Sequence, residues 1–199
     1  MKTDIVPDSE ARGVMARLPP RLRDLASMAR FDRPIGWQLL FWPGAWAIAL
    51  AGNGLAHWGL ILWFVLGAIA MRGAGCVWND IIDRDLDRQV ARTASRPLAS
   101  GALSVRLALV WMAALCLVGL FVLLQLRWQA QLTSLASLAL VAAYPFMKRI
   151  TWWPQVWLGL VFSWAALVGW VEMTGEMSLA GALLYAGSIC WVIGYDSLY

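Results

Sequence analysis

The candidate chemistry of this chain lies in a polar stretch, residues 72–101, between two long apolar segments. Its centre reads N-D-I-I-D-R-D-L-D and carries four aspartates. If this centre is helical, a step of about 100° per residue places four polar side chains within roughly 100° of one another. These side chains are Asn79, Asp80, Asp83 and Asp87. The remaining acid, Asp85, falls on the opposite face, so one face gathers three carboxylates and an amide.

Carboxylates stacked on one helix face repel one another unless a cation neutralises them. Hard oxygen ligands suit Mg²⁺, which usually binds through one or two carboxylates together with substrate phosphates. The spacing therefore predicts a Mg²⁺ site. The alternative is a solvated loop in which neighbouring arginines pair with the acids, and the spacing leaves both interpretations open. The candidate partners are Arg84, Arg88, Arg92 and Arg96.

The composition is that of an integral membrane protein, with the lipid bilayer as its solvent. Of the 199 residues, 61% are hydrophobic and 14% are charged, whereas soluble domains average about 25% charged residues. The mean hydropathy is +0.64. The net charge of +4 indicates membrane topology, because cytoplasmic loops collect Lys and Arg. No nucleic-acid partner is expected.

Six apolar segments, each of about 17 to 24 residues, are long enough to cross a hydrocarbon core of about 30 Å. They are residues 35–51, 58–77, 103–126, 129–147, 154–171 and 179–195. An amphipathic segment, residues 20–30, predicts a short helix at the membrane surface. The expected fold class is all-α, a polytopic transmembrane helical bundle. We expect a cytoplasmic N-terminal arm, residues 1–34, and a transmembrane domain, residues 35–199.

Most Lys and Arg residues lie in the N-terminal arm, in residues 79–106 and in the turn at Lys148 and Arg149. The positive-inside rule places these segments, the acidic stretch and Asp196 on the cytoplasmic side. Carboxylates with Mg²⁺ beside basic residues are what an anionic diphosphate substrate requires. Lys148 and Arg149 are either inside-positive anchors or ligands of such a substrate. Arg72, about 8 Å below the interface, either snorkels or binds an anionic group.

Several sequence blocks resemble the UbiA superfamily of intramembrane aromatic prenyltransferases. The run N-D-I-I-D-R-D-L-D followed by R-T-A-S-R-P-L-A-S-G is similar to the first aspartate-rich motif and loop of that superfamily. Three more blocks are similar to 4-hydroxybenzoate polyprenyltransferases in particular. They are R-P-I-G-W-Q-L-L-F-W-P, M-R-G-A-G-C-V-W-N-D and Y-P-F-M-K-R-I-T-W-W-P-Q. The blocks follow one another in order from about Arg33 to the chain end.

The resemblance implies nine transmembrane helices around a cavity open to the membrane, with two aspartate motifs facing each other. It implies that Asn79, Asp83 and Asp87 bind Mg²⁺ and diphosphate, with Asp80 beside them, and that Asp83 and Asp87 are catalytic. The resemblance also leads us to assign a set of residues to substrate binding: Arg72, Arg92, Arg96, Lys148, Arg149 and Asp196. About six of the nine helices fall within this chain. We therefore expect an N-terminal fragment, inactive alone, whose second motif lies beyond Tyr199.

The implied reaction is Mg²⁺-dependent transfer of a polyprenyl group from polyprenyl diphosphate to the ring of 4-hydroxybenzoate, as in ubiquinone synthesis in a bacterial inner membrane. A UbiA-type enzyme for another aromatic acceptor is one alternative. A CDP-alcohol phosphotransferase would show D-G before the acids, which is absent. An ion-binding transporter would place its acids in the middle of spans. The sequence makes no prediction of prenyl chain length or oligomeric state.

Overall fold

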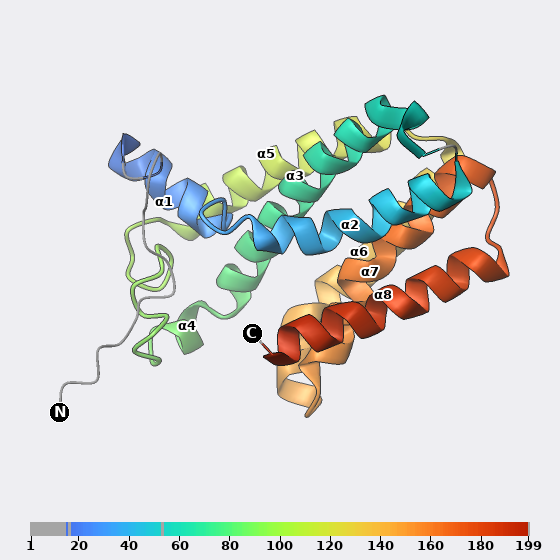
Figure 1. Cartoon of the computed structure of the whole chain (residues 1–199). Helices are drawn as coiled ribbons and strands as arrows, with labels where there is room; N and C mark the ends of the chain where they lie inside the picture. Colours follow the sequence, from blue (N-terminus) through green and yellow to red (C-terminus); the bar gives the residue numbers. More distant parts are fainter. Residues whose placement is uncertain (1–14, 16, 53, 199) are drawn as a thin grey trace. The chain divides into compact units, whose positions relative to one another are not determined.

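The computed structural model describes residues 15, 17–52 and 54–198, and the regular elements in these residues are helices (Figure 1). The chain divides into two compact units. The first holds the described residues up to 34 and residues 70–117, and the second holds residues 35–69 and the described residues from 118 onward. This division groups residues by packing. It is separate from the expected N-terminal arm and transmembrane domain, which stay a prediction.

The helices follow one another with connections of a few residues, except between α4 and α5, where residues 88–104 form a long loop. The first unit contains α1 (Pro20–Met28) and α4 (Arg84–Asp87). Two long helices, α3 (Trp58–Ile82) and α5 (Val105–Leu123), contribute residues to both units. The second unit contains α2 (Ile35–Ala51), the 3-10 helix η2 (Gly54–His57), α6 (Trp128–Ile150), α7 (Pro154–Thr174) and α8 (Leu179–Leu198). The predicted all-α class is confirmed.

The structure confirms helices at all six predicted membrane spans and corrects the ends of several. In the described residues, five helices are long and apolar enough to cross a membrane: α3, α5, α6, α7 and α8. The sixth predicted span, α2, is a helix over the predicted residues; its length of 17 residues is at the lower end of the range of about 17 to 25 for a transmembrane helix, so its crossing of the membrane stays a prediction. The largest difference in an end is at α3, which was predicted to stop at residue 77 and continues to Ile82. Its last turn therefore carries part of the acidic stretch.

In the first unit, α1 packs on the parts of α3 and α5 that belong to this unit. Met28 and Ala29, at the end of α1, are buried with Val77 of α3 and Leu115 of α5. The indole N–H of Trp111 donates a hydrogen bond of 3.1 Å to the carbonyl of Leu25. The amphipathic helix predicted near residues 20–30 is confirmed as a helix, and its location at a membrane surface stays a prediction. The part of α3 that precedes the acids is therefore packed in the core of the first unit.

In the second unit, α7 is the central helix and packs against α2, α6 and α8 (Figure 1). Small residues let the helices approach closely, as is common in membranes. A Cβ atom added to Gly169 would lie 2.7 Å from the carbonyl oxygen of Gly44. Tryptophan side chains bond across to α6, since Trp164 donates its indole N–H to the carbonyl of Thr133 at 2.8 Å. The close approach of α7 to the backbone of α2 depends on glycine at position 169.

Candidate active site at the end of helix α3

The acidic stretch begins inside α3 and ends in α4, with a break at Asp83. The backbone of Asp83 has φ −90° and ψ 1°, so a single unbroken helix through these residues is wrong at this position. The backbone N–H of Asp83 still donates to the carbonyl of Asn79 at 2.9 Å, and that of Asp87 donates to the carbonyl of Asp83 at 2.8 Å. Because these bonds keep the spacing of a helix, the predicted grouping of side chains survives the break.

Burial separates the aspartates as the helical spacing predicts. Asp80, Asp83 and Asp87 are 1%, 8% and 8% exposed, whereas the side chain of Asp85 is 80% exposed. Asp85 pairs with Arg84 at 3.3 Å and with Arg88 at 3.5 Å. Exposed pairs of this kind contribute at most about 1 kcal/mol. The solvated arrangement weighed from the sequence therefore applies to Asp85, and the other three acids are buried.

Arg96 joins two of the buried aspartates. Its Nη1 atom donates to Asp87 Oδ2 at 2.9 Å and to Asp80 Oδ1 at 3.3 Å, and its side chain is 15% exposed. The loop that carries Arg96 is tied to α4, because the hydroxyl of Thr93 donates to the carbonyl of Asp87 at 3.0 Å. Leu98, also in this loop, is 2% exposed and joins the core of the first unit. The loop is therefore ordered around the acids.

Arg30 is a site residue that sequence reasoning missed. Its Nη2 atom donates to Asp80 Oδ1 at 3.0 Å and to Asp80 Oδ2 at 3.2 Å. The two residues are 50 positions apart, and Arg30 is one of several arginines in the N-terminal segment. No local spacing marks it, so only the packing of α1 against α3 reveals the contact.

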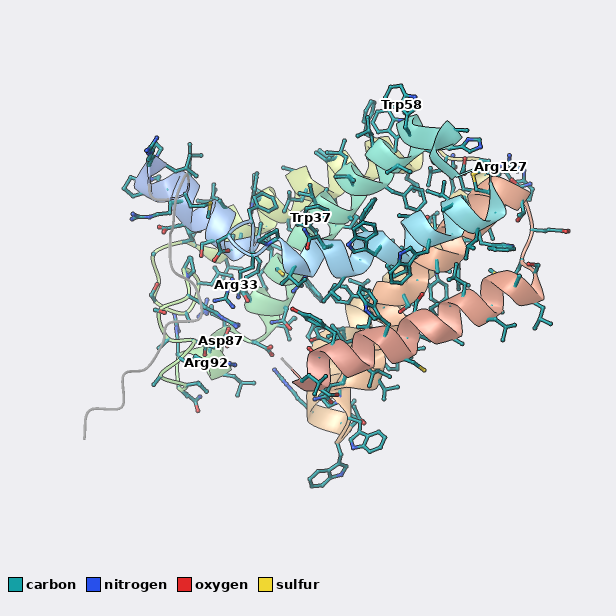
Figure 2. All side chains as sticks on the ribbon, viewed as in Figure 1. Arg33, Trp37, Trp58, Asp87, Arg92 and Arg127 are labelled. Carbon is teal, nitrogen blue, oxygen red and sulfur yellow. The ribbon has the colours of Figure 1, made fainter. Side chains whose placement is uncertain are left out.

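Two other predicted substrate ligands, Arg72 and Arg92, differ in burial. Arg72, partly buried, donates from Nη1 to the sulfur of Cys76 at 2.7 Å, one turn further along α3. Arg92 is exposed and forms no hydrogen bond or ion pair with any residue that the structure describes. Figure 2 labels Arg92 with Asp87 on the short stretch that follows α3. The structure thus brings Asp80, Asp87 and Arg96 together and leaves Arg92 on the surface.

Three residues predicted to bind substrate belong to the second unit. Arg149 is exposed near the end of α6, and Asp196 is exposed near the end of α8. The side chain of Lys148 lies outside the described part of the chain. Their assignment to substrate binding stays a prediction.

The donor set fits Mg²⁺ bound jointly with a diphosphate. Within the described ranges, no three His, Cys, Asp or Glu side chains are grouped to hold a metal ion by themselves. Asp83 and Asp87, one helical turn apart, and the amide of Asn79 supply oxygen atoms of the kind that Mg²⁺ prefers. One or two carboxylates completed by phosphate oxygens are the usual Mg²⁺ arrangement. The carboxylate of Asp80 accepts from the guanidinium groups of both Arg30 and Arg96, whereas the carboxylate of Asp87 accepts from Arg96.

Comparison with known proteins decides the family. Residues 40–199 match the UbiA prenyltransferase family. The chain belongs to this family. The resemblance seen in the sequence motifs is confirmed, and the matched residues include the whole acidic stretch. With its apolar helices, this UbiA family member is an integral membrane protein.

Curated relatives carry closely related names. The chain is 46% identical over 205 residues to a protein of Drosophila pseudoobscura pseudoobscura named 4-hydroxybenzoate polyprenyltransferase, mitochondrial, with 100% of this chain and 51% of that protein covered. It is 42% identical to a 4-hydroxybenzoate octaprenyltransferase of Pseudomonas aeruginosa, with 93% of this chain and 62% of that protein covered. This UbiA family chain spans about half the length of the eukaryotic relatives that it matches.

Solved structures share the fold. An apo UbiA homologue from Aeropyrum pernix K1 superposes with a TM-score of 0.64 at 28% identity, covering 92% of this chain and 64% of that one. A UbiA homologue from Archaeoglobus fulgidus, bound to DMAPP and Mg²⁺, gives a TM-score of 0.69 at 18% identity, covering 86% of this chain and 61% of that one. The second likeness shows the fold alone.

Proposed function

We propose that the protein containing this chain transfers a polyprenyl group from a polyprenyl diphosphate to the ring of 4-hydroxybenzoate. The observation that carries the proposal is the identity of 42% to 49% to relatives named 4-hydroxybenzoate polyprenyltransferase or octaprenyltransferase, over 87% to 100% of this chain. The buried acids at the end of α3 supply the chemistry that a diphosphate leaving group needs. The two features together favour this reaction over a phosphotransferase or a transporter.

In the proposed site, Asp83, Asp87 and Asn79 hold Mg²⁺ together with the diphosphate. When bound, Mg²⁺ offsets the negative charge that develops on the departing diphosphate. The UbiA homologue from Archaeoglobus fulgidus is described as bound to DMAPP and Mg²⁺, which supports the use of Mg²⁺ with a prenyl diphosphate. Because Asp83 and Asp87 are each only 8% exposed, their charges act with little screening by water.

The remaining residues of the proposed site bind and orient the anionic substrate. Arg96 neutralises Asp80 and Asp87 at 3.3 and 2.9 Å, and so holds the loop over the acids. Arg92, exposed on the same loop, has its guanidinium available for a phosphate oxygen. We assign the same role to Arg72, Lys148 and Arg149, and we also assign Asp196 to substrate binding. The aromatic acid binds beside the diphosphate, and the prenyl chain lies in the apolar surroundings.

We further propose that this site lies on the cytoplasmic side of a bacterial inner membrane, as does the N-terminus. The support is the concentration of Lys and Arg in the N-terminal segment, in residues 79–106 and at Lys148 and Arg149. Cysteine labelling from outside intact cells checks the orientation. Substituted cysteines at Ser95 and Ser100 are expected to stay unlabelled, and one at His57 is expected to react.

The enzymatic test uses membranes that contain the full-length protein, Mg²⁺, a polyprenyl diphosphate and labelled 4-hydroxybenzoate. We expect a labelled lipid product that disappears when EDTA removes Mg²⁺. Parallel reactions with a labelled CDP-alcohol and with other labelled aromatic acids separate the alternatives. A labelled lipid formed from the CDP-alcohol alone, or no labelled lipid with any polyprenyl diphosphate, would contradict the proposal.

A further inference from the structure

The end of helix α1 places an arginine where helices usually carry glycine. Arg30 has φ 59° and is the only residue other than glycine with positive φ among the described residues. Its N–H donates to the carbonyl of Ser27 at 2.9 Å, and the N–H of Phe31 donates to the carbonyl of Ala26 at 3.0 Å. These two bonds define the Schellman motif, whose left-handed residue is commonly glycine because a Cβ atom is disfavoured there. An arginine at this position indicates that the side chain has a task.

The task is visible in the contacts of the guanidinium group. Nη1 donates to the carbonyl of Ser27 at 3.0 Å, which orients the group across the end of its own helix. Nη2 donates to both carboxylate oxygens of Asp80 at 3.0 and 3.2 Å. The side chains of Arg30 and Asp80 are 12% and 2% exposed. The left-handed backbone thus directs a rigid, charged donor into the buried part of the acidic stretch.

Asp80 links Arg30 to the proposed metal ligands. Its Oδ1 atom also accepts from Arg96 Nη1 at 3.3 Å, and the same nitrogen donates to Asp87 Oδ2 at 2.9 Å. The chain of contacts runs from Arg30 through Asp80 and Arg96 to Asp87, and its four charges sum to zero. Both oxygens of Asp80 are occupied by charge-assisted hydrogen bonds, which are among the stronger ones in proteins.

We infer that Arg30 is a positioning residue for the metal-binding acids, acting through Asp80, and that Asp80 is a buried counter-ion instead of a Mg²⁺ ligand. The inference rests on the proposed function, because it takes Asp83 and Asp87 as the metal ligands. It also replaces the role that the sequence motif implies for Asp80. Residues that hold the ligands of a metal ion through hydrogen bonds fix the geometry of those ligands. Loss of such an outer residue typically lowers metal affinity or activity about 10-fold to 100-fold.

The test measures Mn²⁺ binding to the purified full-length protein in the presence of an unreactive prenyl thiolodiphosphate, because the proposed site holds the metal together with a diphosphate. Electron paramagnetic resonance detects the bound Mn²⁺ and needs no turnover. Arg30→Gly is the central variant, because glycine accepts the left-handed backbone and removes only the side chain. Arg30→Lys retains the charge without the fork. Arg21→Gln, an exposed arginine on the same helix, is the matched control. Asp80→Asn and the double variant Arg30→Gly with Asp80→Asn complete a double-mutant cycle.

We expect Arg30→Gly and Asp80→Asn each to raise the Mn²⁺ dissociation constant about 10-fold. The dissociation constant of Arg30→Lys is expected to lie between those of Arg30→Gly and the unmodified protein. Arg21→Gln is expected to leave it unchanged. Because both residues act through one contact, the dissociation constant of the double variant is expected to lie within about threefold of that of the single variant that binds Mn²⁺ less tightly. Wild-type affinity in Arg30→Gly overturns the inference. A double variant that loses about the product of the two single effects also overturns it, since Asp80 then binds metal independently.

The same experiment separates the inference from the proposed function. If the unmodified protein binds Mn²⁺ and the cycle behaves as expected, but no polyprenyl diphosphate is consumed, the positioning role stands and the proposed reaction fails. If the unmodified protein binds no Mn²⁺, both fail together. Thermal unfolding of each variant accompanies the titration. If Arg30→Gly does not fold, Arg30→Lys takes its place in the cycle, and if Asp80→Asn does not fold, Asp80→Glu takes its place.

Discussion

Arg96 Nη1 lies 2.9 Å from Asp87 Oδ2, and this ion pair fastens the loop after α4 to the acidic stretch. The side chains of Arg96 and Asp87 are 15% and 12% exposed, so water competes little with the pair. The same nitrogen reaches Asp80 Oδ1 at 3.3 Å. One guanidinium group therefore neutralises two buried carboxylates that belong to consecutive helices, and the loop and the acids form one structural unit.

Removal of Arg96 should therefore destabilise the fold as well as the site. Arg96→Gln leaves Asp87 as a buried carboxylate without its guanidinium partner, and breaking a buried pair from one side costs about 3 to 5 kcal/mol. Arg84→Gln removes an exposed pair with Asp85 and should cost less than about 1 kcal/mol. Thermal unfolding of the two purified variants measures the difference. Equal unfolding midpoints would mean that the Arg96 pair is not formed in the membrane protein.

The acids themselves should divide into essential and dispensable members. We expect Asp83→Asn and Asp87→Asn each to lower Mg²⁺-dependent prenyl transfer at least about 100-fold, because each removes a charged ligand while keeping a similar shape. Asp85→Asn is the matched control, since the Asp85 side chain is 80% exposed. Product formation is measured in membranes with equal amounts of inserted protein. Near-normal turnover in either of the first two variants would remove that residue from the metal site.

Much of the fold could be predicted from the sequence, because membrane helices are recognisable as long apolar runs. The ends were less predictable. The apolar run of α3 stops at residue 77, but the helix continues to Ile82, since polar residues do not by themselves end a helix. The separation of Asp85 from the other acids also followed from spacing alone, because a helix repeats every 3.6 residues.

The contact between Arg30 and Asp80 could not be predicted in this way. It joins residues 50 positions apart and depends on how α1 packs against α3, which no local pattern encodes. The left-handed backbone of Arg30 is equally hidden, because the usual sequence signal for it is glycine. The sequence identified the acids, and the packing identified what orients them.

The close approach of α2 and α7 gives a prediction about stability. Gly169→Ala puts a Cβ atom 2.7 Å from the carbonyl oxygen of Gly44. Because backbone atoms move less readily than a flexible side chain, we expect the free energy of unfolding to fall by about 1 to 3 kcal/mol. Gly187→Ala, in α8, meets no atom within 4 Å and should be neutral or stabilising by up to about 1 kcal/mol. Unfolding of both variants in the same detergent compares them directly. A Gly169→Ala protein as stable as Gly187→Ala would show that the two helices lie further apart.

Arg92 should affect substrate binding without affecting the fold. Its side chain is exposed and makes no ion pair within the described part of the chain, so Arg92→Gln leaves no buried charge behind and the unfolding midpoint should not change. A charge-assisted hydrogen bond to a diphosphate oxygen is worth about 1.5 to 3 kcal/mol when desolvated, and solvent reduces this at an exposed position. We therefore expect the KM for polyprenyl diphosphate to rise about 3-fold to 10-fold with little change in kcat, and the effect to shrink at high salt. Steady-state kinetics at two salt concentrations measures both. A fall in kcat at constant KM would place Arg92 at the transition state instead, and unchanged kinetics would remove it from the site.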